Sequence, residues 1–296
     1  MCASSLRVFL FFLILIPFQS LSPIQGAFIT LPFFSDPLTL SLWENKIHCF
    51  PFHLYDIIYL SSVKIDIQGR ILYKNDQETL SRIEEITTKA HNHKTKIILS
   101  VGGKVELYDN SFASLSINMQ EFQKSVEKNI EELNLDGINI DWSSNPNEMV
   151  LKSIVTNFKS SPKTQEKLIT LTNLAFPTLF ADTYNAFDLV NVLNFNKNDE
   201  VSLESNVNFV AGRFLRLIKN EKILVAVNFY KYGQNEIEDI ETTRLIKEAV
   251  EKFNPHAIRG ISAWDVLYDS GAENKECQWA GSLVLAGFLG GNKKEL

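Results

Sequence analysis

Short, strongly apolar runs alternate along the chain with longer segments in which apolar residues recur every three or four positions. The apolar content of each run is nearly continuous, which is typical of parallel strands that are covered on both faces. Eight such runs occur, at residues 27–34, 56–63, 96–101, 135–142, 168–174, 188–195, 222–229 and 258–264. This alternation predicts βα units around a parallel sheet.

Helical periodicity fills most of the gaps between the runs. In residues 76–93, the apolar residues Leu80, Ile83, Ile86 and Ala90 follow one another at spacings of three and four. The same pattern occurs in residues 119–133, 147–158, 203–218, 240–253 and 277–288, and is weak after the first and fifth runs. Eight strands with about eight crossovers favour one closed (β/α)8 TIM barrel of class α/β, although composition alone leaves a doubly wound open sheet as an alternative.

The first residues carry a different pattern. A polar start that includes Arg7 is followed by nine apolar residues, 8–16, and then by Pro17. Such a run is too short to span a bilayer and has the length of a signal-peptide core. We therefore predict a signal peptide at residues 1–26, cleaved between 20 and 26, where Ser20, Ser22 and Gly26 are small. An uncleaved anchor is the alternative.

The barrel is predicted to occupy residues 27–292, and the last four residues form a separate feature. Lys293, Lys294, Glu295 and Leu296 resemble the Lys-Asp-Glu-Leu retrieval signal, with a base in place of its acid. The tail is either a signal for retrieval to the endoplasmic reticulum or a charged end of a secreted protein. The predicted location is the secretory pathway, either outside the cell or in the lumen of the endoplasmic reticulum, with no membrane attachment after cleavage.

The net charge and the cysteines limit which partners and which covalent links the chain can have. The formal charge of −6 argues against nucleic acid as a partner. Cys2 lies in the predicted leader, which leaves Cys49 and Cys277. In an oxidising compartment this pair can form a disulfide that joins the two ends of the barrel; two buried thiols are the alternative. We expect a monomer.

The segment from Leu135 to Ser143 carries the strongest chemical signal. Side chains on a strand alternate between faces, so Asn139, Asp141 and Ser143 share one face, opposite to Ile138, Ile140 and Trp142. Polar side chains among covering helices would be costly to desolvate, so we expect them to point into the barrel and toward its carboxyl end. They form either a functional site or a polar plug.

This segment resembles the Asp-Gly-x-Asp-x-Asp-x-Glu signature of glycoside hydrolase family 18, the chitinases and chitinase-like lectins. Asp136, Gly137 and Asp141 match the signature. Asn139 stands where the family has its middle Asp, and Ser143 stands where the family has the Glu that acts as the general acid.

Other strands extend the resemblance over nearly the whole predicted mature chain. Ser100, Gly102 and Gly103 are similar to the third-strand Ser-x-Gly-Gly motif. On the sixth strand Phe195 and Asn196 replace a Tyr-Asp pair, Tyr230 ends the seventh strand, and Trp264 falls on the tryptophan of the eighth. Residues 231–257 are too few for the α+β insertion domain of deep-groove chitinases, so the resemblance implies a shallow groove.

The resemblance implies a pseudoenzyme. Active members use the Glu to protonate the leaving group and the acetamido group of the substrate as nucleophile; the changes at Asn139, Ser143, Phe195 and Asn196 each remove an acid, a charge or a hydroxyl. Substitute acids would be Glu148, expected at the N-terminus of its own helix, or Asp265.

Sugar binding is still compatible with the residues that remain. We expect an amino-sugar oligosaccharide or a glycoprotein as partner. The predicted binding residues are Trp264, Asp141, Tyr230, Asn139 and Ser143, with Trp142 near the same rim. For Trp264, a purely structural position closing the barrel is the alternative.

No cofactor or metal is predicted. His91 and His93 are two residues apart on a helix, a spacing that does not converge on a metal. His48 and His53, with Cys49, give weak support for zinc. Three functions stay open: a non-catalytic glycan binder, an active glycoside hydrolase with an unrecognised acid, and a luminal partner or storage protein.

Overall fold

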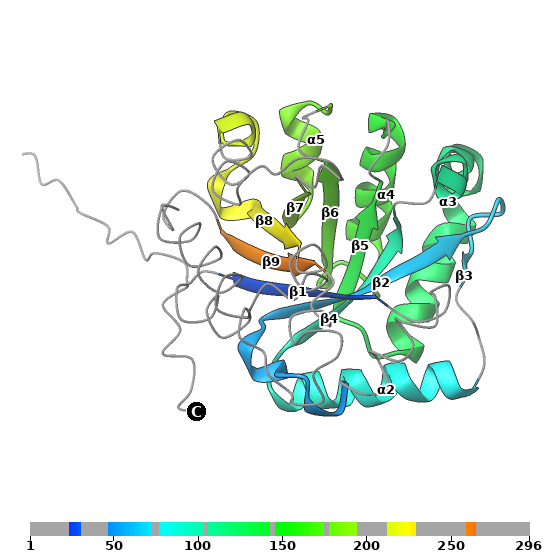
Figure 1. Cartoon of the computed structure of the whole chain (residues 1–296). Coiled ribbons are helices and arrows are strands. Elements are labelled where there is room, and N and C mark those ends of the chain that lie inside the picture. Colours follow the sequence, from blue (N-terminus) through cyan, green and yellow to red (C-terminus); the bar gives the residue numbers. More distant parts are fainter. Residues whose placement is uncertain are drawn as a thin grey trace, which may run out of the picture.

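The computed structural model of the chain describes residues 24–30, 47–72, 77–103, 106–142, 146–174, 178–193, 212–228 and 259–264. Its centre is a closed barrel in which every neighbouring pair of strands is parallel and β1 pairs with both β2 and β9 (Figure 1). The barrel strands are β1 (Ile24–Thr30), β2 (Ile57–Ile65), β4 (Lys96–Gly102), β5 (Gly137–Asp141), β6 (Leu168–Leu174), β7 (Leu189–Leu193), β8 (Ile223–Asn228) and β9 (Gly260–Trp264). The predicted (β/α)8 barrel is confirmed, and the doubly wound alternative is excluded.

β1 begins earlier than the apolar pattern predicted. It starts at Ile24 instead of Ala27, because Ile24, Gln25 and Gly26 pair with residues 260–262 of β9. Cleavage of a leader after Gly26 would remove this part of the barrel seam. The part of the predicted cleavage window that precedes Ile24 is compatible with an intact β1.

A short antiparallel strand, β3 (Ile71–Leu72), extends β2 beyond the barrel and was not predicted. The turn between them is held by Asp66, whose Oδ1 accepts hydrogen bonds from the backbone N–H groups of Gln68 and Arg70. Gly69 in this turn has φ +85, a conformation that glycine adopts without strain.

The helices α2 (Gln77–Asn92), α3 (Glu106–Glu132), α4 (Glu148–Ser160) and α5 (Ala181–Ala186) lie outside the barrel (Figure 1). α3 begins at Glu106 instead of the predicted Met119 and changes direction at Asn118, where φ is −109 and ψ is 24. Of the predicted helix 203–218, the described part is helical at residues 212–214. The predicted helices 240–253 and 277–288 lie outside the described residues. No helix in the described segments is long and apolar enough to cross a membrane.

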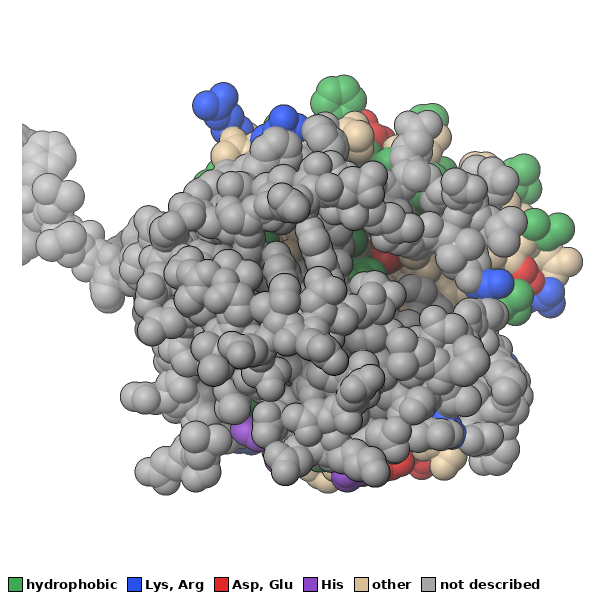
Figure 2. All heavy atoms as spheres, viewed as in Figure 1, with side chains coloured by type: hydrophobic (Ala, Val, Ile, Leu, Met, Phe, Trp, Pro, Cys, Tyr) green, Lys and Arg blue, Asp and Glu red, His purple; other side chains and the backbone are tan. Residues whose placement is uncertain are grey.

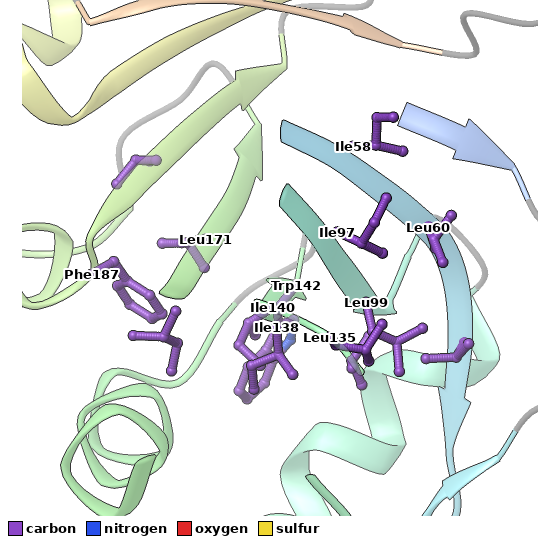
Figure 3. Close-up of a cluster of buried hydrophobic side chains, with 14 of the residues drawn as sticks. Ile58, Leu60, Ile97, Leu99, Leu135, Ile138, Ile140, Trp142, Leu171 and Phe187 are labelled. Atoms are coloured by element: carbon purple, nitrogen blue, oxygen red, sulfur yellow. The ribbon is translucent and has the colours of Figure 1, made fainter. Parts of the chain in front are cut away.

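The main hydrophobic core lies between the barrel and its helices. Ile138, Ile140 and Trp142 of the β5 segment point outward into it, as the alternation predicted (Figure 3). Trp142 is 3% exposed and its ring stacks on Phe112 of α3, with centroids 4.8 Å apart. Trp142 therefore packs beneath α3, and the prediction that it lies near the rim of the site was wrong.

The amino ends of the strands are pinned by a repeated contact. An aspartate precedes β2, β5 and β7, and its carboxylate accepts the backbone N–H of the second residue of the neighbouring strand. The pairs are Gln25 N to Asp56 Oδ2 at 2.9 Å, Ile97 N to Asp136 Oδ2 at 2.8 Å, and Ile169 N to Asp188 Oδ2 at 2.8 Å. A basic side chain completes two of these contacts, since His91 Nε2 and Lys159 Nζ lie 2.8 Å from Asp136 and Asp188. Asp136, although part of the signature, therefore acts at the end of the barrel opposite to the predicted site.

Candidate functional site

The inward-facing side chains are arranged in layers of four, each contributed by alternate strands, as in other (β/α)8 barrels. We call the carboxyl end of the barrel its mouth. The strand registers, combined with the tilt of the strands in a closed barrel, define three layers of side chains between the barrel centre and the mouth. The polar layer consists of Tyr59, Asn139, Asn191 and Ser262. The intermediate layer consists of Phe28, Ser100, Thr172 and Ala226. The mouth layer consists of Ser61, Asp141, Leu193 and Trp264.

Asn139 is fully buried in the polar layer, and its amide is hydrogen-bonded at both ends. Its Nδ2 donates to Ser100 Oγ at 2.8 Å and lies 2.9 Å from Thr172 Oγ1. Its Oδ1 accepts from Thr170 Oγ1 at 2.8 Å. Asn139 is therefore part of the plug inside the barrel, and a ligand at the mouth would have to break these bonds to reach it.

Asp141 is the last residue of β5 and lies in the mouth layer, 3% exposed. The chain of β4 passes very close to it. Gly102 has φ +98, and a Cβ added there would meet the carbonyl oxygen of Asp141 and lie 2.5 Å from the Phe112 ring. Gly103, with φ +126, donates its N–H to the same carbonyl at 2.9 Å. The Gly-Gly of the third-strand motif is thus required by backbone conformation and by the close approach of β4 to β5.

Trp264 ends β9 in the mouth layer and is partly exposed. Its ring centroid lies 4.3 Å from that of Phe28, which in turn stacks on Tyr59 at 4.4 Å with an interplanar angle of 11°. The three rings form an aromatic column from the mouth to the polar layer. The Trp264 ring therefore packs against Phe28 in the barrel interior, while the residue as a whole is partly exposed.

Tyr59 stays neutral at the foot of this column. Burial raises the pKa of its hydroxyl to about 12, although the nearby side chains of Asn191 and Thr170 lower it slightly. In the polar layer, the four side chains are amides and hydroxyls, so the centre of the barrel carries no charge at neutral pH.

Glu148 is engaged in a structural contact. Asn147 caps its helix, α4, through bonds from the N–H groups of Met149 and Val150 at 3.0 and 3.2 Å. Glu148 Oε1 instead accepts from Phe180 N at 2.6 Å and Thr183 Oγ1 at 2.9 Å, at the start of α5. The prediction that Glu148 lies in the first turn of its own helix is confirmed. Its carboxylate also joins α4 to the start of α5, which was not predicted.

Several predicted site residues lie outside the described residues: Ser143, Phe195, Asn196, Tyr230, Asp265 and Cys277. Cys49 is disulfide-bonded, so it is not a thiolate ligand for zinc. Its pairing with Cys277 remains a prediction.

Three members of the barrel interior, Tyr59, Asn191 and Ser262, were not predicted from the sequence. A signal was present, because polar residues alternate with apolar ones at the ends of several runs, as in Thr170 and Thr172 of β6. The alternation identifies inward-facing positions on one strand. Their meeting in one layer depends on the registers of all eight strands.

The fold and this arrangement define a (β/α)8 barrel whose candidate site lies at the carboxyl ends of its strands, the position of active sites in such barrels. The sequence model of the family described as Glycosyl hydrolases family 18 matches residues 40–269. The chain belongs to this family. Among curated proteins, none matches the chain significantly.

Solved chitinase structures share the fold. The family 18 chitinase ChiB of Flavobacterium johnsoniae superposes with a TM-score of 0.69 and 16% identity, over 91% of this chain and 94% of that one. The Group IV chitinase of Ostrinia furnacalis gives 0.68 and 14%, over 90% and 100%. A mutant class V chitinase of Nicotiana tobaccum, solved in complex with NAG4, gives 0.64 and 11%, over 90% and 99%. At these identities the likeness concerns the fold.

Proposed function

We propose that this chain is a chitinase-like protein of the secretory pathway that binds N-acetylglucosamine-containing glycans or glycoproteins at its mouth without cleaving them. The observation that carries the proposal is the state of Asn139. At the place of the family's middle Asp, the chain has a neutral amide whose donors and acceptor are engaged by Ser100, Thr170 and Thr172. This group cannot supply the charge that an adjacent catalytic carboxylate would use.

The sequence supports the loss of cleavage independently. At the position of the general acid, Ser143 has a hydroxyl that titrates far above neutral pH, so it cannot protonate a glycosidic oxygen. General acid catalysis contributes about 10²–10⁴-fold to such reactions. Phe195 and Asn196 remove a further hydroxyl and a further carboxylate by the same resemblance. Glu148 is a poor substitute because two hydrogen bonds hold it at α5.

Binding is supported by the composition of the mouth layer. Trp264 is partly exposed and offers an apolar side chain for a sugar. Asp141 belongs to the same mouth layer, on the opposite side of the barrel. The Nicotiana tobaccum enzyme was solved with NAG4, and a Group II chitinase domain of Ostrinia furnacalis with (NAG)5. Since residues 231–257 are too few for an insertion domain, we expect a shallow groove and modest affinity for long chains.

The test of binding is a titration with chitin tetramer and pentamer followed by tryptophan fluorescence. We expect a saturable change in the parent protein that disappears in Trp264→Ala. Trp142→Phe is the matched control, because Trp142 is buried beneath α3, and it should leave the change in place. A parent protein that shows no change, by fluorescence or calorimetry, would contradict the proposal.

Hydrolysis of a fluorogenic N-acetylglucosamine oligomer separates a binder from an enzyme. We expect no turnover in the parent protein. Turnover that is lost in Asp265→Asn or Glu148→Gln would overturn the pseudoenzyme reading. The combined variant Ser143→Glu, Asn139→Asp, Phe195→Tyr and Asn196→Asp is the positive control for substrate access, and slow hydrolysis by it would show that the mouth accepts the oligomer.

A second candidate function, a luminal partner protein, is favoured by one observation. The described part of the chain has five large exposed hydrophobic side chains, of which four are strongly exposed and the fifth, Leu72, is 43% exposed. Ile67 follows β2, Ile117 precedes the break in α3, Met149 begins α4 and Phe180 precedes α5, and these side chains are 72–86% exposed. Figure 2 shows hydrophobic side chains at the upper and right edges of the molecule in this view. Oligomer titrations without response would favour this candidate.

A further inference from the structure

Three members of the polar layer carry buried polar atoms that have no hydrogen-bond partner within the described structure. These atoms are Tyr59 Oη, Asn191 Oδ1 and Nδ2, and Ser262 Oγ. They come from β2, β7 and β9, and all three side chains are fully buried. The fourth member, Asn139, has partners for its amide at both ends. Four of the five unpartnered buried side-chain atoms in the described residues thus belong to this one layer, and the fifth, Asn129 Oδ1, lies in α3.

The three side chains belong to one layer and approach one another in the barrel interior. Gly26 of β1 lies between two of them, since a Cβ added there would be 3.2 Å from Ser262 Cβ and 3.3 Å from Tyr59 Cε2. The side chains of Asn191 and Thr170 lie near enough to the Tyr59 hydroxyl for weak hydrogen-bonding contributions that lower its pKa. By distance and angle, however, the Tyr59 hydroxyl and the Asn191 amide make no hydrogen bond within the described residues. The polar atoms of Tyr59, Asn191 and Ser262 thus lie in one region of the barrel but lack well-formed hydrogen bonds to one another.

Buried polar atoms in native proteins are nearly always hydrogen-bonded to protein or to ordered water, because an unsatisfied group keeps its full desolvation penalty. Globular proteins hold on the order of one buried water per 27 residues, each with about three polar partners. Two hydroxyls, one amide donor and one amide acceptor match the two donors and two acceptors of a water molecule. The layer has no charged side chain, so its chemistry fits a neutral ligand better than an ion.

We propose that the polar layer is an internal hydration site, in which ordered water binds Tyr59, Asn191 and Ser262 at the centre of the barrel. The water completes a hydrogen-bonded network across the barrel. Thr170 connects Asn139 with Tyr59. Its Oγ1 donates to Asn139 Oδ1 at 2.8 Å, and its side chain also lies near the Tyr59 hydroxyl. Since Trp264 rests on Phe28 and Phe28 on Tyr59, the site also fixes the foot of the aromatic column beneath the mouth.

The direct test is a crystal structure of the full chain at about 1.5 Å resolution. We expect a water peak within about 2.7–3.2 Å of Tyr59 Oη and of a polar atom of Asn191 or Ser262. The proposal is overturned if no such peak is present, or if Tyr59 and Asn191 bond directly to each other. This outcome is independent of whether the mouth binds glycans.

A pair of matched variants tests the same site in solution. Tyr184→Phe is the control, because Tyr184 is a buried tyrosine whose Oη has protein partners, Asn173 Nδ2 at 2.6 Å and Thr178 N at 3.2 Å. Its Tm should fall by about 2–6 °C. Tyr59→Phe removes one anchor of the water, and its Tm should fall by about 1–4 °C. A higher Tm for Tyr59→Phe would mean that the hydroxyl was unsatisfied and would sink the proposal.

Discussion

Asn139 occupies the interior of the barrel as an amide in the place where the family signature has a carboxylate. An ionised carboxylate there would require charge in a site that is fully buried. The amide instead donates to Ser100 and accepts from Thr170 without any charge. Tyr59 belongs to the same neutral layer, and its raised pKa is a consequence of burial. At this scale, the layer at the centre of the barrel consists of neutral amides and hydroxyls.

Tyr59 should make stability depend on alkaline pH. Burial raises its pKa to about 12, whereas the pKa of a tyrosine in the unfolded chain is about 10. Between these values the unfolded state binds fewer protons than the folded state, so the free energy of unfolding falls as pH rises. This contribution is fully present below pH 10 and is lost as pH approaches 12, with a total of about 3 kcal/mol.

The measurement is urea unfolding of the parent protein and of Tyr59→Phe at several pH values between about 9 and 12. We expect the free energy of unfolding of the variant to decline less steeply than that of the parent over this range. Parallel curves would show that Tyr59 ionises in the folded protein as it does in the unfolded one.

Element boundaries show where local pattern and tertiary pairing disagree. β1 extends back to Ile24 because β9 offers pairing partners there. α3 begins at Glu106, ahead of its clearly periodic part, and turns at Asn118, whose Nδ2 donates to Ile67 O of the β2–β3 turn at 2.9 Å. α5 has no side-chain cap of its own at Phe180 and is held by Glu148 of the preceding helix. β1 and α5 thus begin where a neighbouring element supplies partners, and α3 changes direction where one does.

Glu148→Ala should destabilise the start of α5. It leaves the N–H of Phe180 and the hydroxyl of Thr183 without their acceptor, and we expect a loss of about 1–2 kcal/mol in the free energy of unfolding. Glu166→Ala is the control, since Glu166 is exposed on a turn and should change stability by less than about 0.5 kcal/mol. Equal stabilities in denaturant unfolding of the two variants would show that the contact contributes nothing.

At the scale of the whole molecule, the contacts that stabilise the barrel and the residues of the candidate site lie at opposite ends of the strands. The amino ends of the strands carry the aspartates Asp56, Asp136 and Asp188, which fix neighbouring strands to one another. The mouth carries Asp141 and Trp264. Closure of the barrel joins β1 to β9, so segments from the two ends of the sequence lie side by side (Figure 1). Cys49, which precedes β2, is disulfide-bonded, so the closed barrel carries a covalent link in addition to its strand pairing.

We predict that Cys49 pairs with Cys277 and that the bond stabilises the barrel by restricting the unfolded chain. Loss of a disulfide that closes so long a loop costs about 2–5 kcal/mol. Reduction, or the variant Cys49→Ser, should lower the Tm accordingly, and a peptide map without reduction should contain the linked pair. A map that shows Cys277 as a free thiol would contradict the pairing.

The sequence by itself determined the alternation of strands and helices and the positions of Asp141 and Trp264 at strand ends. It favoured a closed barrel, and the pairing of β1 with both β2 and β9 decided the closure. The alternation of elements and the two strand-end positions depend on periodicity and on motifs that are local in the chain, and strand alternation fixes which side chains point inward. Tertiary structure alone decided that Tyr59, Asn139, Asn191 and Ser262 share one layer and that Glu148 serves α5. Those relations join residues from distant segments, because they depend on the registers of eight strands and on the packing of helices across them.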